Sequence, residues 1–169
     1  MGTWMDIKGP VVADTVYADG KLVAKDVSFT LPGIEFMTAD VQAMGNMSVP
    51  LIGLMENMEL SITKVGIDLG LRRMNKLKKQ NFEFRWVQNS VNKDGTTEVK
   101  GCKAFVRTLP GSFPETGVEV GSATELEHTY NVTRMQIYEN GNEVVCVDRL
   151  SQVLKVNGVD YMKNITKLL

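Results

Sequence analysis

Apolar and polar residues alternate over most of the chain, which is the period-2 pattern of half-buried β-strands. The alternation is clearest at Phe82, Phe84 and Trp86, which are separated by single charged residues. Extended runs of this kind are predicted at 11–17, 22–29, 81–89, 97–109, 125–138 and 143–154. Asp-Gly or Asn-Gly pairs at 19–20, 94–95, 140–141 and 157–158 favour tight hairpin turns. The pattern therefore predicts a mainly β, antiparallel fold.

The largely apolar stretch 27–65 is predicted to form one long hairpin. Its two arms are 34–44 and 47–65. Gly and Asn tolerate positive φ, so Gly45-Asn46 is the expected reversal point. Both arms exceed the usual strand length of about 5–6 residues. Such a hairpin needs partners for its outer edges, and a second copy of the chain is the simplest source.

The two faces of this hairpin differ in polarity. Met58, Leu60 and Ile62 share one face of the second arm. The other face carries polar residues from both arms, namely Thr38, Asp40, Gln42, Glu59, Ser61 and Thr63. This polar face suits either ordinary solvent or the lining of a wet channel. A phase slip near Phe36-Met37 predicts a bulge or bend, and Pro50 predicts an edge position or a bulge.

The segment 68–79 is the one internal stretch with convincing helical spacing. Asp68 is a suitable N-cap, and Leu71, Met74 and Leu77 form an apolar stripe. Five basic residues and one acid give the segment a net charge of +4, which leaves −5 for the rest of a chain whose net charge is −1. This basic face is either solvated surface or a docking patch for an acidic partner. A second, short amphipathic helix is predicted within 159–169.

Composition fits one domain spanning 1–169, with 1–10 as a possible N-terminal arm. Hydrophobic residues make up 43%, enough for a core, and the net charge of −1 gives no general attraction for nucleic acid. The sequence has no signal-peptide pattern and no apolar run near the roughly 18 residues of a membrane helix. Cys102 and Cys146 are expected to be free, buried thiols in a reducing compartment.

No residue is singled out as a nucleophile, general base or metal ligand. The sequence has no Cys/His cluster with metal spacing, no P-loop, no G-x-S-x-G and no dinucleotide fingerprint. The one histidine, His128, lies in a strand pattern and is expected to be structural. We therefore expect no catalytic residue, no cofactor and no metal.

Two stretches resemble the major tail tube proteins of contractile-tailed phages and of phage-tail-like (R-type) bacteriocins. In the first, 27–63, the matching features are Leu31-Pro32, Met44-Gly45 and Gly53-Leu54. In the second, 128–169, they are Asn140-Gly141, Asp148, the run Lys155-Val156-Asn157-Gly158-Val159-Asp160 and Leu168-Leu169. By element order the resemblance covers about two thirds of the chain.

The resemblance implies a structural protein, not an enzyme. It implies an antiparallel β-barrel or sandwich with one flanking α-helix and a short C-terminal helix, the tail tube fold shared by type VI secretion tubes. Family members form hexameric rings, which stack into a hollow tube that sheath contraction drives through the target envelope. The implied partners are other copies, the sheath, tape-measure and baseplate proteins, and DNA only in passage, with no membrane anchoring. Assembly is expected in the bacterial cytoplasm, and the product is the tail of a phage or bacteriocin particle.

Three sets of residues carry the site hypotheses. The channel is expected to be lined by Asp40, Gln42, Glu59, Ser61 and Thr63. Contact with the next ring is assigned to Met44, Gly45, Asn46 and Met47. The sheath is expected to face Arg72, Arg73 and Lys76. The alternatives are a monomeric β-barrel that binds a small ligand beside Phe82, Phe84 and Trp86, and an enzyme of unfamiliar type.

Overall fold

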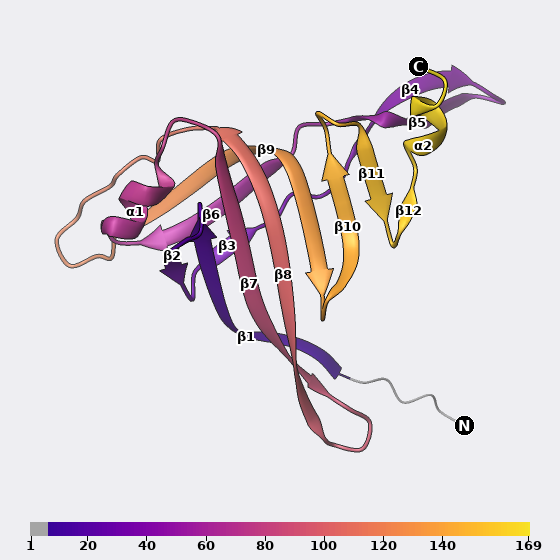
Figure 1. The fold of residues 1–169 in the computed structure, drawn as a ribbon. Coiled ribbons are helices and arrows are strands. Elements are labelled where there is room, and N and C mark those ends of the chain that lie inside the picture. The colour runs from indigo at the N-terminus through magenta and orange to yellow at the C-terminus, as the bar shows by residue number, and fades with distance from the viewer. Residues whose placement is uncertain (1–6) are drawn as a thin grey trace.

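The computed structural model describes residues 7–169, and most of its regular structure is β-strand (Figure 1). The strands are β1 (Ile7–Ala18), β2 (Lys21–Lys25), β3 (Ser28–Thr30), β4 (Phe36–Gln42), β5 (Asn46–Met55), β6 (Glu59–Val65), β7 (Gln80–Val91), β8 (Thr97–Pro110), β9 (Glu125–Glu139), β10 (Asn142–Asp148), β11 (Val153–Val156) and β12 (Val159–Asp160). The helices are α1 (Leu69–Met74) and α2 (Lys163–Thr166). Of the predicted N-terminal arm, residues 1–6 lie outside the described part and 7–10 begin β1.

Ten strands form one antiparallel sheet, in the order β12-β11-β10-β9-β8-β7-β1-β2, with β6 also paired to β9 and β3 to β6. One edge of β9 is shared, because 125–131 pair with β6 and 134–139 pair with β10. The sheet curls, so that Phe29 of β3 packs on Phe84 of β7 with ring centroids 4.6 Å apart. The mainly β, antiparallel fold with few helices is the one predicted.

The core lies inside the curled sheet. Phe82 and Phe84 are almost completely buried there, and Met58, Leu60 and Ile62 of β6 pack into the same cluster. Burying a side chain of this size contributes about 1.5–3 kcal/mol. The alternating patterns of β6 and β7 therefore identified the core face correctly.

The β4–β5 hairpin is a separate two-stranded sheet that projects from the main body (Figure 1). Its reversal lies at Met44 and Gly45, with φ of 53° and 123°, one residue earlier than predicted, because Asn46 already pairs with Gln42. A register shift between Phe36 and Thr38 confirms the predicted bulge. The predicted second arm was too long, since β5 ends at Met55 and β6 joins the main sheet.

Other predicted boundaries also moved, for local reasons. Residues 22–29 form two strands, β2 and β3, because Asp26 between them has φ of 50°. The predicted strand 143–154 is divided into β10 and β11, because the Asp148 carboxylate accepts hydrogen bonds from the amides of Leu150 and Ser151 and so forms a turn. Cys102 and Cys146 are buried and unbonded to each other.

The predicted helix 68–79 was also too long. Asp68 caps it as expected, and Leu71 and Met74 are buried. The helix ends at Met74, and Leu77, expected in the apolar stripe, is 74% exposed. The chain must leave the helix here, because β7 begins at Gln80 and its side chain donates to the backbone of α1.

Candidate assembly surfaces

The β4–β5 hairpin has two outer edges that no other described strand pairs. Its register places Val41 opposite Met47, and both side chains are about half exposed, at 46% and 49%. On the other face, Ser48 Oγ donates a hydrogen bond to Asp40 at 2.7 Å. An isolated hairpin with an exposed apolar face and open edges is marginally stable by itself and is a template for pairing with another chain.

The hairpin tip contains the four residues that were predicted from the sequence to contact the next ring. Met44 is fully exposed, and Gly45 adopts a φ that side chains rarely tolerate. Asn46 is held by a hydrogen bond from the side chain of Gln42, and Met47 follows it on β5. The tip is therefore ordered and accessible, and what it touches in an assembly stays a prediction.

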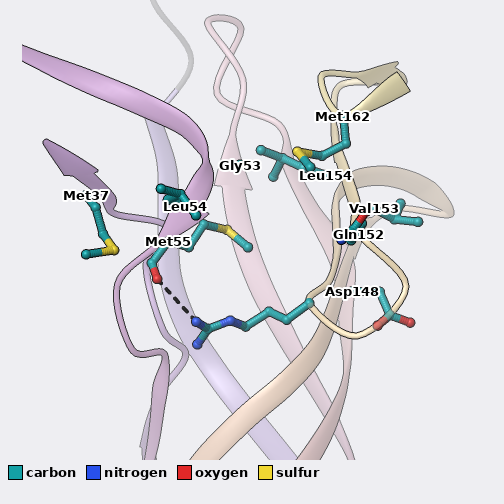
Figure 2. Close-up of a pocket in the computed structure, with 10 residues that line it drawn as sticks. Met37, Gly53, Leu54, Met55, Asp148, Gln152, Val153, Leu154 and Met162 are labelled. Carbon is teal, nitrogen blue, oxygen red and sulfur yellow. Dashed lines mark hydrogen bonds between the residues drawn. The ribbon is translucent and has the colours of Figure 1, made fainter. Parts of the chain in front are cut away.

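The hairpin base is fastened to the main sheet around a cavity of about 310 Å³ (Figure 2). Arg149, in the turn after β10, donates from Nη2 to the carbonyl oxygen of Met55 at 3.2 Å. Gly53 packs so close to the C-terminal segment that a Cβ there would lie 3.3 Å from Met162 Sδ. No local pattern in the sequence points to this role of Arg149, since the two bonded residues are 94 positions apart.

A polar surface, here called the acidic strip, covers the outer face of β6 and of the first half of β9. It consists of Glu59, Ser61, Thr63, Glu125, Glu127, Thr129 and Asn131. Ser61 Oγ donates to Glu127 at 2.9 Å across the strands. Among the described residues, the outward positions of these two segments include three Glu and no Lys or Arg.

The predicted channel residues are outside the core but do not share one sheet. Glu59, Ser61 and Thr63 belong to the acidic strip, whereas Asp40 and Gln42 lie on the polar face of the projecting hairpin. This corrects the expectation that they line both arms of one hairpin. The contribution of β9 was missed, although its alternation of Glu and polar residues from 125 to 131 is visible in the sequence.

The start of α1 is held by an ion pair with β6. Asp68 accepts a hydrogen bond from the amide of Leu71 at 3.0 Å and pairs with Lys64 Nζ at 2.7 Å. The hydrogen bond from Lys64 is the main cause that lowers the pKa of Asp68. Lys64 is buried although charged, so this pair also satisfies a cation beneath the helix.

The predicted sheath-facing residues differ in how firmly the protein holds them. Arg73 donates from Nη1 to the carbonyl oxygen of Leu22 at 3.2 Å, and Lys76 Nζ lies 3.7 Å from Asp19. Arg72 is exposed. The three cations therefore lie on α1 and just after it, and two of them contact the β1–β2 hairpin.

A buried polar cluster supports the end of α1 from below. His128 Nδ1 lies 2.9 Å from Asn75 Oδ1, Tyr130 donates to the carbonyl oxygen of Met74 at 2.9 Å, and Gln80 donates to that of Arg73 at 2.8 Å. Burial and, secondarily, Lys64 lower the pKa of His128, and burial raises the pKa of Tyr130. This placement agrees with the interpretation of His128 as a structural residue.

Within residues 7–169, no group of three or more His, Cys, Asp and Glu side chains is placed to hold a metal ion. No helix in this described part is long and apolar enough to cross a membrane.

A family model described as phage tail tube protein FII matches residues 11–169. Comparison with curated proteins gives no significant match. Among solved structures, the chain is similar to a chain of the sheath–tube complex of the extracellular contractile injection system PVC in its extended state, at 17% identity and a TM-score of 0.52, covering 77% of this chain and 90% of that one. It is also similar to a chain of the sheath/tube terminator of that system in its extended state, at 15% identity and a TM-score of 0.50. This match covers 76% of this chain and 95% of that one.

At these identities the structural matches concern the fold alone, and the family match concerns nearly the whole chain. The family match defines a structural protein of a phage tail rather than an enzyme. The chain belongs to the phage tail tube protein FII family.

Proposed function

We propose that this tail tube protein forms hexameric rings, which stack into the hollow inner tube of a contractile particle and are driven through the target envelope when the sheath contracts. The observation that carries the proposal is the β4–β5 hairpin, whose edges are open and whose apolar face is half exposed. Docking this hairpin on a neighbouring copy would pair its edges and cover its apolar face. Ring contacts of this kind join different patches head to tail and close when the rotation divides the circle.

The channel is proposed to be lined by the acidic strip, with Asp40 and Gln42 of the hairpin adding to it. Affinity for DNA comes largely from Lys and Arg contacts to phosphate. The described outward positions of the acidic strip include three Glu and no Lys or Arg. In a particle that carries DNA, a channel lined by this strip would let the DNA pass without binding it.

The other two surfaces are assigned to the remaining partners. The tip residues Met44, Gly45, Asn46 and Met47 are proposed to contact the next ring. Arg72, Arg73 and Lys76 are proposed to face the sheath protein. Baseplate and tape-measure proteins complete the expected set of partners, with assembly in the bacterial cytoplasm.

The experiment is negative-stain electron microscopy of the purified protein over a concentration series, together with its mass by light scattering. Hollow tubes or six-membered rings are expected, with preformed baseplates added as nuclei if the protein alone stays dispersed. A protein that remains monomeric even with baseplates would contradict the proposal and favour the small-ligand barrel. That alternative has less support, because Phe82 and Phe84 fill the core where a ligand would bind.

A further inference from the structure

An apolar pocket of about 510 Å³ opens on the outer face of β7, β8 and β9, far from the hairpin and from the acidic strip. Lys103 lies between Arg85 and Tyr138 in the strand register, and Phe105 packs edge-on against Tyr138 with ring centroids 5.9 Å apart. Gly101 leaves the floor open, since a Cβ there would meet nothing within 4 Å. The pocket thus combines aromatic walls with two cations.

The two cations at this pocket are not equivalent. Arg85 Nε is already paired with Glu83 at 2.6 Å, and its guanidinium lies over the Tyr17 ring. Lys103 is exposed and forms no ion pair with another described residue. Lys103 is therefore the cation available to an acidic partner.

The loop from 111 to 124, between β8 and β9, has the complementary chemistry. It contains Glu115 and Glu119 and no Lys or Arg. Val118 and Val120 are 82% and 102% exposed, which leaves two apolar side chains unpartnered on either side of a carboxylate. The amide of Ser122 donates to the carbonyl oxygen of Glu119 at 3.2 Å, a turn that presents this Val-Glu-Val segment at the surface.

The start of the loop packs against β9. Gly111 lies against the backbone of Thr129, where an added Cβ would come 2.2 Å from its carbonyl oxygen, and the amide of Ser112 donates to the same oxygen at 3.3 Å. Pro114 is buried. The exposed valines are therefore carried on an anchored loop, which reduces the entropy lost when the loop binds.

The loop and the pocket lie at opposite ends of the same strands. On β9, Tyr138 at the pocket is 13 residues from Glu125 at the end of the loop, which at about 3.3 Å per residue separates them by roughly 43 Å. The loop cannot reach the pocket of its own chain. A loop that fills the pocket of another copy repeats head to tail, as tube growth requires.

We propose that the Val118-Glu119-Val120 segment of one copy docks in the Lys103 pocket of the next. Glu119 pairs with Lys103, and the two valines cover the faces of Phe105 and Tyr138. The proposal rests on self-assembly, as proposed above, and adds a particular contact that the hairpin does not provide.

The test is a charge swap in the full-length chain. Glu119→Lys and Lys103→Glu are each expected to raise the concentration needed for assembly about tenfold, and the double variant is expected to recover most of the loss. Glu98→Lys, on β8 beyond the pocket, and Lys100→Glu, on the opposite face of β8, are the matched controls and should assemble like the wild type. Single variants that assemble normally, or a double variant no better than the singles, would overturn the contact.

A disulfide test reads the contact directly. Two differently tagged variants, Val120→Cys and Asn140→Cys, are mixed and oxidised. We expect a disulfide-linked dimer that carries both tags, and little disulfide-linked dimer from either variant alone. Both variants also carry Cys102→Ser, because Cys102 itself lines the pocket, and the buried Cys146 contributes little background. If the wild type forms normal tubes but the mixed variants form no such disulfide, the proposed contact is rejected and the proposed tube function still holds. If the wild type never assembles, even on baseplates, both the contact and the tube function are rejected.

Discussion

Arg149 and Met55 are 94 positions apart, and the Arg149 guanidinium donates a hydrogen bond to the Met55 carbonyl oxygen at 3.2 Å (Figure 2). This bond ties the turn after β10 to the last residue of β5. A second tie is the hydrogen bond from the amide of Glu56 to the carbonyl oxygen of Glu35 at 2.9 Å. The direction in which the hairpin projects therefore depends on contacts at its base.

Replacing Arg149 by Ala is expected to loosen the hairpin and to lower the free energy of unfolding by about 1–2 kcal/mol, because a hydrogen bond from a charged donor is lost. Amide hydrogen exchange should become faster in β4 and β5 and stay unchanged in β7 and β8. Arg72→Ala, at an exposed position, is the control and should change neither quantity. Unchanged exchange in β5 would show that Arg149 does not hold the hairpin.

Replacing Gly45 by Val should leave the monomer folded but block tube elongation. Gly45 has φ of 123°, which a β-branched residue avoids, while a Cβ would meet nothing within 4 Å. The strain is thus confined to the tip. Thermal unfolding checks the fold, and tube length by electron microscopy checks assembly. Gly33→Val, at another glycine with open space around it, should elongate normally; tubes of normal length from Gly45→Val would refute the assignment of the tip.

The sequence predicted those parts of the fold that local patterns encode. The Asn140-Gly141 turn and the buried face of β7 follow directly from turn chemistry and alternation. The division between β5 and β6 did not, because it depends on distant partners such as Arg149. Only the β6 part of the acidic strip was predicted, because alternation identifies the outer face of β6. The β9 part was missed, because the register that places Glu127 beside Thr63 joins residues 64 positions apart.

Reversing Arg72, Arg73 and Lys76 to Glu should leave tube formation intact and prevent the sheath from assembling around preformed tubes at physiological salt. The cations would be replaced by charges that repel an acidic sheath surface. Because Arg73 and Lys76 also contact Leu22 and Asp19, Arg72→Glu alone serves to separate docking from folding and should show a weaker defect of the same kind. Normal sheath assembly on the triple variant would rule out this docking surface.

We expect His128 to make the stability of the fold sensitive to mild acid. Its pKa in the folded protein is below the ordinary 6.5, mainly because the ring is buried. The neutral ring is thus favoured, so its contribution to stability is complete above pH 6.5 and is lost as the pH falls toward the lower, folded-state pKa. The free energy of unfolding should fall more steeply between about pH 7 and about pH 5 in the wild type than in His128→Gln. Equal slopes would show that another group controls this range.

The orientation of the acidic strip can be read by cysteine labelling of assembled tubes. In Glu59→Cys tubes, a small maleimide that diffuses through the channel should react, whereas a maleimide attached to a bulky polymer should not. In Lys78→Cys tubes, where the exposed position lies in the basic segment, both reagents should react. In dispersed monomers both reagents should label both variants, and the buried Cys102 and Cys146 should add little signal.

If the bulky reagent labels Glu59→Cys tubes as fast as monomers, the strip faces outward. If neither reagent reacts in tubes, the strip is buried between subunits. Only size-selective labelling is consistent with a channel wall.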